Sequence, residues 1–195
     1  MNRNILLKRI LDVIQNEIVP ETIKGVKKGN KVFGGAILKK SDLSTVILGT
    51  NREIENPLNH GEISTLNNYF ALSKKHEVKD LLFVSTHEPC PMCLSAITWA
   101  GFDNIYYFFN YNDTADMFHI SHDLNILKDV FGREDGEYNR LNPYWQSLGI
   151  KDLIEQENNS EKKILTEKAR LITQTYKQLS EVYQKTKNDN EIPLN

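Results

Sequence analysis

The alternation of strand-like and helix-like segments in the first half of the chain most limits what it can fold into. Residues 32–38 and 45–50 have the composition of strands, and the polar residues 39–44 between them predict an antiparallel hairpin. Residues 81–85 form a short apolar run between polar residues, which indicates a strand buried on both faces. Residues 105–109 predict a further strand, rich in aromatic side chains.

Helical segments separate these strands. Apolar residues at helical spacing predict one helix that begins near His60 and another over residues 90–100. An amphipathic helix is also expected at residues 3–19, ending near Pro20. Strands that alternate with helices in this order predict an α/β protein with a mixed sheet and helices on its faces.

The second half of the chain has a weaker pattern. Residues 112–129 predict a loop followed by a helix, and residues 160–187 predict a long amphipathic helix. The tail from Asn188 is expected to be frayed. We therefore expect a main domain over residues 1–155 and a helical extension over residues 156–195, packed on this domain or on an oligomer partner.

Composition favours a soluble protein that acts on a small substrate. The chain has 195 residues, 39% hydrophobic and 26% charged, and a formal net charge of −2. Proteins that grip a long nucleic acid usually carry a basic excess, which is missing here. No apolar run is long enough to span a membrane, and the first residues lack the apolar centre of a signal peptide, so a cytoplasmic location is the default expectation.

A candidate metal site comes from two short motifs. One contains His60 and Glu62 in the order His-Gly-Glu, and the other contains Cys90 and Cys93 in the order Pro-Cys-Pro-Met-Cys. A catalytic zinc site uses three nitrogen or sulfur ligands and leaves a fourth position for water, and one His with two Cys supplies that number. Two cysteines three residues apart can lie on one side of a helix's first turn, where the helix dipole favours thiolates.

Glu62 has a different expected role. It lies two residues after His60 and cannot share that side chain's direction on a first helical turn, so it is a poor ligand candidate. Bound zinc lowers the pKa of water from 15.7 to about 7, and a nearby carboxylate can accept the proton and pass it on. The pattern His-x-Glu followed by Pro-Cys-x-x-Cys is the signature of zinc deaminases.

Two other interpretations of the cysteine pair stay open at this point. A structural zinc site would need a fourth ligand, for which His87 is the best candidate. A thioredoxin-like redox pair is less favoured, because no early strand leads into the motif. His119 and His122, three residues apart, leave a second metal site as a further alternative.

These motifs resemble the cytidine and deoxycytidylate deaminase superfamily, in particular its nucleobase and tRNA-adenosine deaminase branch. The resemblance covers residues 33–111 and includes Phe-Gly-Gly-Ala at residues 33–36 and Thr-His-Glu-Pro-Cys-Pro-Met-Cys at residues 86–93. It implies a three-layer α/β/α sandwich with a five-stranded mixed sheet, a Zn²⁺ cofactor and a homodimer or larger homo-oligomer. Glu62 is implied to be the proton carrier.

The resemblance also implies substrate contacts. Asn51 matches a position that binds the substrate ring or sugar, and the backbone of Gly61 would lie near the ring. Phe33 and Trp99 are candidates to stack on the base or to form a side of its pocket, although each could equally be part of the core. Two acids in the region after the aromatic strand are candidates for a specificity residue, namely Asp116 and Asp123.

The substrate is not fixed by the motifs. Residues 60–66 look like fungal cytosine deaminase, whereas residues 90–100 look like bacterial guanine deaminase. The favoured hypothesis is a hydrolytic deaminase of a nucleobase or nucleoside, with guanine or cytosine as substrate and ammonia as product. The alternative is a tRNA adenosine deaminase-like protein or a non-catalytic subunit stabilised by zinc, and the charge balance does not favour tRNA.

Overall fold

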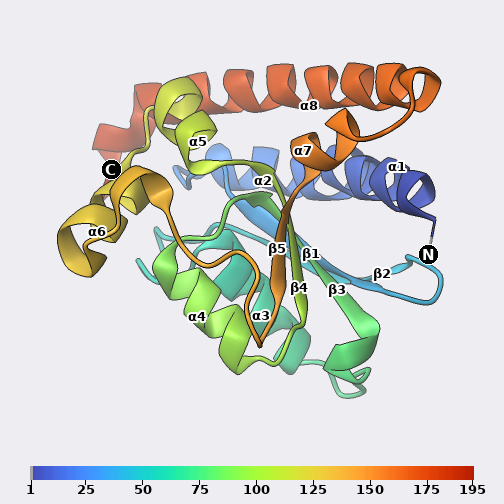
Figure 1. Ribbon diagram of the computed structural model, residues 1–195. Helices are drawn as coiled ribbons and strands as arrows, with labels where there is room; N and C mark the ends of the chain where they lie inside the picture. The colour runs from blue at the N-terminus through green and yellow to red at the C-terminus, as the bar shows by residue number, and fades with distance from the viewer. Residues whose placement is uncertain (1) are drawn as a thin grey trace.

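The computed structural model describes residues 2–195 and shows a five-stranded sheet with helices on both faces (Figure 1). The strand order is β2-β1-β3-β4-β5. The first pairs, β2 with β1 and β1 with β3, are antiparallel, whereas β3, β4 and β5 are parallel. The strands are β1 (Gly34–Lys39), β2 (Thr45–Thr50), β3 (Leu81–His87), β4 (Asn104–Phe109) and β5 (Gln146–Gly149). The predicted α/β class with a mixed five-stranded sheet is confirmed.

Side chains alternate between two cores, as the pleat of a sheet requires. Ile37 and Phe83 point to the core beneath α3 and α4, whereas Leu38 and Val84 point to the opposite core. That opposite core is covered by α1, α2, α5, α7 and α8. The α-helices are α1 (Arg3–Val13), α2 (Val19–Val26), α3 (Gly61–Phe70), α4 (Pro91–Trp99), α5 (Tyr111–Phe118), α6 (His122–Phe131), α7 (Ile150–Glu155) and α8 (Asn159–Thr186).

The first helical segment does not end near Pro20, so that prediction was wrong. A π-helical turn, Ile14–Ile18, joins α1 directly to α2. Pro20 lies in the first turn of α2, a position where its missing N–H is tolerated. The widened turn therefore lets the chain continue as a helix to Val26.

The C-terminal part adds elements that the sequence pattern did not predict. β5 has only four residues, and one of them is a glycine, so it carries almost no strand signal.

α8 contacts α1, α2, α5 and α7 on the side away from α3 and α4 (Figure 1). The boundary between residues 155 and 156 stays a prediction. Among residues 2–195, no helix is long and apolar enough to cross a membrane.

The C-terminal tail is held in place, and the expectation that it is frayed was wrong. Ile192 is buried, and Lys31 donates a hydrogen bond to the carbonyl of Leu194. The hydroxyl of Tyr183 donates to the side chain of Asn195, with an O···O distance of 2.6 Å. These contacts place the tail against the residues that precede β1, close to the N-terminal ends of α3 and α4.

Candidate active site and metal centre

The first turns of α3 and α4 converge on one point, and each helix begins next to a predicted metal ligand. His60 is the N-cap of α3, and Cys90 is the N-cap of α4. Both have extended backbones, with ψ of 164° and 167°, so each side chain lies at the mouth of its helix. Pro91 fits the first turn of α4, where no backbone N–H is needed. Two positive helix ends therefore meet where anionic sulfur is expected.

Glycine allows β1 and α3 to touch backbone to backbone. A methyl group on Gly61 would lie 2.6 Å from the backbone nitrogen of Gly34, closer than a Cβ atom can approach. The first turn of α3 therefore rests directly on the start of β1. This contact brings His60 beside Phe33, which immediately precedes β1.

The three predicted ligands have the spacing of a zinc site. The Nδ1 atom of His60 lies 3.5 Å from Sγ of Cys90 and 3.7 Å from Sγ of Cys93. Zn–S bonds of about 2.3 Å and Zn–N bonds of about 2.0–2.1 Å at tetrahedral angles would place nitrogen and sulfur about 3.6 Å apart. Within residues 2–195 this is the one group of metal-binding side chains that could share an ion. The donor set and its geometry fit Zn²⁺.

The charges at the three ligands also fit a cation. A hydrogen bond from Cys93 holds the pKa of Cys90 well below its usual range, with further help from His60, whereas burial raises the pKa of Cys93. Burial lowers the pKa of His60, but its contact with Cys90 and the nearby carboxylates outweigh burial and raise that pKa to about 9. The ligands therefore create a negative potential that favours a positive charge on His60. A bound divalent cation would supply positive charge in place of that proton.

Glu62 lies beside the ligands rather than among them. One carboxylate oxygen accepts a hydrogen bond of 2.7 Å from Oγ of Ser85, and the other lies 3.4 Å from Sγ of Cys93. Burial raises the pKa of Glu62, as does the negative charge of Cys90. A carboxyl with a raised pKa near the metal position is suited to take up and release protons during a reaction.

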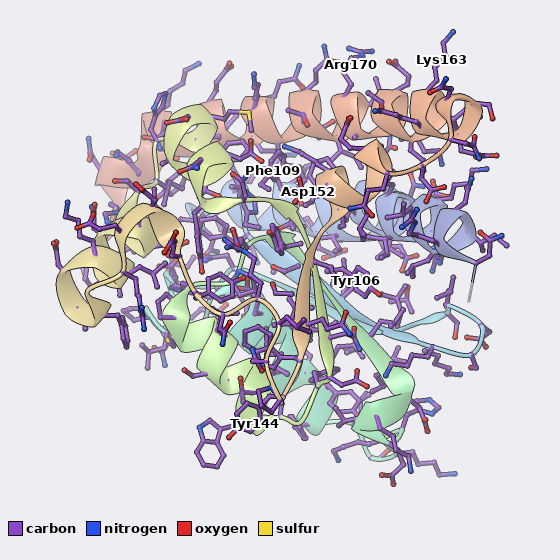
Figure 2. All side chains as sticks on the ribbon, in the orientation of Figure 1. Tyr106, Phe109, Tyr144, Asp152, Lys163 and Arg170 are labelled. Carbon is purple, nitrogen blue, oxygen red and sulfur yellow. The ribbon has the colours of Figure 1, made fainter. Side chains whose placement is uncertain are left out.

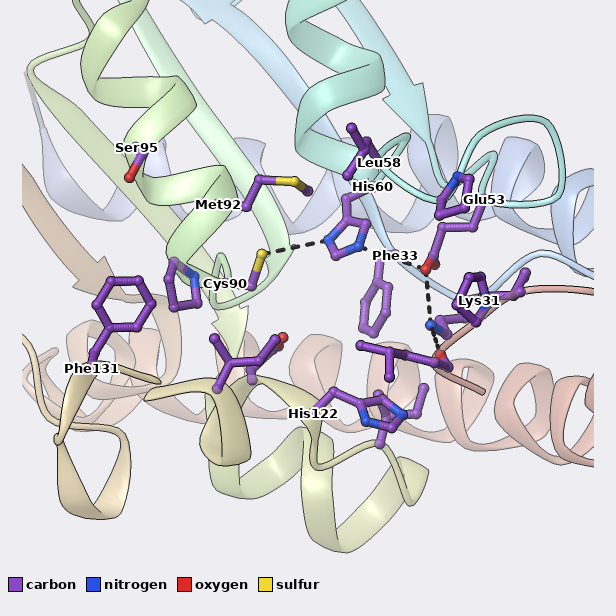
Figure 3. Close-up of a pocket in the computed structure, with 18 residues that line it drawn as sticks. Lys31, Phe33, Glu53, Leu58, His60, Cys90, Met92, Ser95, His122 and Phe131 are labelled. Atoms are coloured by element: carbon purple, nitrogen blue, oxygen red, sulfur yellow. Dashed lines mark hydrogen bonds and ion pairs between the residues drawn. The ribbon is translucent and has the colours of Figure 1, made fainter. Parts of the chain in front are cut away.

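A cavity of about 420 Å³ opens over the metal ligands (Figure 3). Its floor includes His60 and Cys90, and one wall comes from Phe33. Another wall is α6, through Asp123 and neighbouring apolar residues, and the C-terminal tail closes a third side. The lining is mostly apolar with a few polar groups, which is typical of small-molecule sites.

Phe33 and Asp123 are the predicted substrate contacts that line this cavity. Burial raises the pKa of Asp123 well above its usual range, and the charge of Cys90 adds to the shift. Gly61 lies at the start of α3, directly beneath the site. Their roles toward a substrate stay predictions.

Three other candidates do not line the cavity. Trp99 is 92% exposed and lies nine residues along α4 from Cys90, which places it about 13 Å away along the helix axis. Asp116 is exposed on α5, whose buried face consists of other residues. Asn51 is buried, and its side chain is hydrogen-bonded at both ends to Glu53. The prediction that Trp99 and Asp116 contact the base was wrong, because both side chains are exposed and neither lines the cavity.

The histidines do not provide further ligands. Nδ1 of His87 lies 2.9 Å from Oγ1 of Thr86, and its ring packs among aromatic side chains of the core. His119 is exposed at the end of α5, whereas His122 lines the cavity. Neither joins the metal-ligand group, so a fourth protein ligand and a second metal site are both absent from the described part of the chain.

Sequence reasoning missed several residues that line the cavity. Lys31 and Glu53 are buried and charged, and they come from the segments just before β1 and just after β2. Ile192 and its neighbours come from the far end of the chain. No spacing along the sequence marks these residues, because the sheet and the tail bring them together only in three dimensions.

Comparison with known proteins agrees with this geometry. Residues 16–109 match the cytidine and deoxycytidylate deaminase zinc-binding region. The guanine deaminase of Bacillus subtilis (strain 168) is 28% identical over 119 residues, covering 60% of this chain and 70% of that protein. The X-ray structure of guanine deaminase from Bacillus subtilis has a TM-score of 0.50 at 24% identity and covers 73% of this chain and 87% of that one. Guanine deaminase from Nitrosomonas europaea gives a TM-score of 0.51 at 16% identity, over 78% of this chain and 81% of that one.

The ligand set, the adjacent Glu62 and the fold together define a zinc-binding deaminase that acts by hydrolysis. Residues 16–109 of the chain match the cytidine and deoxycytidylate deaminase zinc-binding region, and they contain all three ligands.

Proposed function

We propose that this protein hydrolyses the C2 amino group of guanine, giving xanthine and ammonia. The observation that carries the hydrolytic chemistry is the tetrahedral spacing of His60, Cys90 and Cys93 beside a buried carboxylate. The choice of guanine is supported by the 28% identical relative, a guanine deaminase, and by the presence of Asp123 in the cavity wall.

The residues of this chain can move every proton that the reaction requires. Bound zinc would lower the pKa of water from 15.7 to about 7. Glu62 accepts a proton as the water oxygen bonds to C2, and donates that proton to ring nitrogen N3. It then takes the proton of the new hydroxyl and passes it to the amino group, so that ammonia leaves and the C2 carbonyl forms. Glu62 ends in its starting state.

Asp123 is proposed to recognise the edge of the base next to C2. A carboxyl that keeps its proton offers a donor and an acceptor side by side. Guanine presents the complementary pair in N1–H and O6. The raised pKa of Asp123 and its place in the cavity wall support this pairing. Phe33, which also lines the cavity, offers an aromatic ring for the face of the base.

Ammonia release from a panel of substrates tests the proposal. Zinc-loaded protein would be given guanine, cytosine, adenine and their nucleosides, with bound zinc measured in the same samples. We expect guanine to be deaminated with the highest kcat/KM. Fully zinc-loaded protein that releases no ammonia from guanine would refute the substrate assignment. Tight tRNA binding without release from any free base would favour the alternative function.

A further inference from the structure

Two charged residues are buried together at the edge of the active-site cavity. The side chains of Lys31 and Glu53 are 4% and 3% exposed, and Nζ lies 2.9 Å from Oε1 (Figure 3). Lys31 precedes β1 and Glu53 follows β2, so the β1–β2 hairpin brings the two residues to one end of the sheet. Burying two ions is costly, and apolar residues of similar size often stabilise a fold as well or better. A need for stability alone does not explain this pair.

The carboxylate of Glu53 connects two neighbours of the site. Its Oε1 atom faces Nε2 of His60 at 3.6 Å, on the side of the ring opposite the cysteines. Its Oε2 atom accepts a hydrogen bond of 2.5 Å from the side chain of Asn51, and its backbone N–H donates to the same side chain. Lys31 donates to Oε1 and to the carbonyl of Leu194, and so fixes the carboxylate in place.

The tautomer of His60 depends on what faces its second nitrogen. Nδ1 faces both cysteine sulfurs, so a metal bound there requires that atom to be unprotonated, and the ring proton must then sit on Nε2. A carboxylate that faces Nε2 favours this tautomer, orients the ring and makes it a stronger ligand. The geometry points to Glu53, anchored by Lys31, as a positioning residue that sets the tautomer and orientation of the metal ligand His60.

This inference rests on the proposed zinc-dependent function, but its test does not depend on which base is the substrate. Zinc affinity would be measured by competition with a chelator for the full-length protein and for two double variants. K31M/E53Q removes both charges and keeps a neutral acceptor at position 53, whereas K31M/E53M removes the acceptor too. We expect affinity to fall in that order, with a loss of about 10–100-fold in K31M/E53M. The zinc-free double variants should unfold at a denaturant concentration equal to or above that of the parent.

A second measurement reads the histidine directly. In zinc-loaded parent protein, the ¹⁵N spectrum should show His60 with its proton on Nε2 and with slow exchange of that proton. We expect faster exchange in K31M/E53M. Glu55 provides a matched control, since it lies in the same loop and is 58% exposed. E55Q removes one negative charge nearby and should leave zinc affinity unchanged.

Three possible results test the role proposed for Glu53. Zinc affinity within about twofold of the parent in K31M/E53M, with an unchanged Nε2 proton, would show that the pair only supports the fold. If the double variants do not fold, E53Q with Lys31 retained is judged by the same two measurements. Reduced zinc affinity in a protein that does not act on guanine would leave the role of Glu53 intact and overturn only the proposed substrate.

Discussion

Replacing Glu62 with glutamine tests the proton path that we propose. The amide keeps the size of the side chain, and its oxygen can still accept the hydrogen bond of 2.7 Å from Ser85. Its NH₂ group can face Sγ of Cys93, which now lies 3.4 Å from the carboxylate. Fold and zinc content should therefore be preserved. An amide cannot accept a proton from water or deliver one to a ring nitrogen, so turnover should be lost.

The expected decrease in kcat follows from the number of proton transfers that Glu62 carries out. A positioned acid or base typically contributes about 10²–10⁴-fold to a rate. Because Glu62 moves protons in both halves of the reaction, we expect kcat to fall by about 10⁴-fold, which is about 5.4 kcal/mol at 1.36 kcal/mol per tenfold. The assay is steady-state ammonia release from guanine, with zinc content measured on the same samples and E55Q as the matched control. A fully zinc-loaded E62Q protein with kcat within about tenfold of the parent would remove Glu62 from the mechanism.

Stability measurements give an independent check on the state of Glu62. Burial raises its pKa above the ordinary 4.5, so the folded state resists ionisation of this group. The free energy of unfolding therefore decreases as pH rises from the pKa of Glu62 in the unfolded state to its higher pKa in the folded state. In zinc-free protein, E62Q should therefore gain stability over the parent as pH rises above the ordinary value of 4.5. Urea unfolding at several pH values measures the difference, and a relative loss of stability at high pH would contradict the raised pKa.

Three further predictions concern the rest of the cavity and its support. Asp123→Leu should lower kcat/KM for guanine by about 10–100-fold with zinc content unchanged, because it removes two neutral hydrogen bonds of about 0.5–1.5 kcal/mol each, whereas Asp123→Asn keeps a donor and an acceptor and should retain most of the activity; steady-state kinetics would show it. Deleting residues 190–195 removes Ile192 and one cavity wall, and should raise KM for guanine by about tenfold while zinc binding persists. Arg140→Met should cost about 1–3 kcal/mol, because it removes the ion pair of 2.8 Å with fully buried Glu88. Burial raises the pKa of Glu88 and Arg140 lowers it, so this cost should shrink as pH falls and the carboxyl takes up a proton, as unfolding at pH 5 and 8 would reveal.

The metal centre could be predicted from sequence because each of its parts is local. His60 and Glu62 lie within one helical turn, as do Cys90 and Cys93, and the turn itself fixes how each pair is arranged. Only the convergence of the two helix ends had to be assumed. The fold subsequently brought Nδ1 of His60 within 3.7 Å of both sulfurs.

The substrate contacts could not be predicted in the same way. Asn51 was expected to face the substrate, but Glu53 occupies both ends of its side chain through a turn that covers only three residues. Trp99 shares a helix with the cysteines, yet about 13 Å of helix separates it from Cys90 and its side chain is exposed. In both cases the residue type was suitable, and the position was decided by neighbours that the motif does not include.

The family match contains the metal centre but only part of the cavity wall. Residues 16–109 contain all three metal ligands and Glu62. Part of the cavity wall lies outside this range, in α6 and in the C-terminal tail. A protein can therefore keep the hydrolytic centre unchanged while α6 and the tail are exchanged for others. For this chain, Asp123 on α6 is the group whose replacement should change which base is accepted, with the reaction itself retained, because it lines the cavity and does not belong to the metal-ligand group.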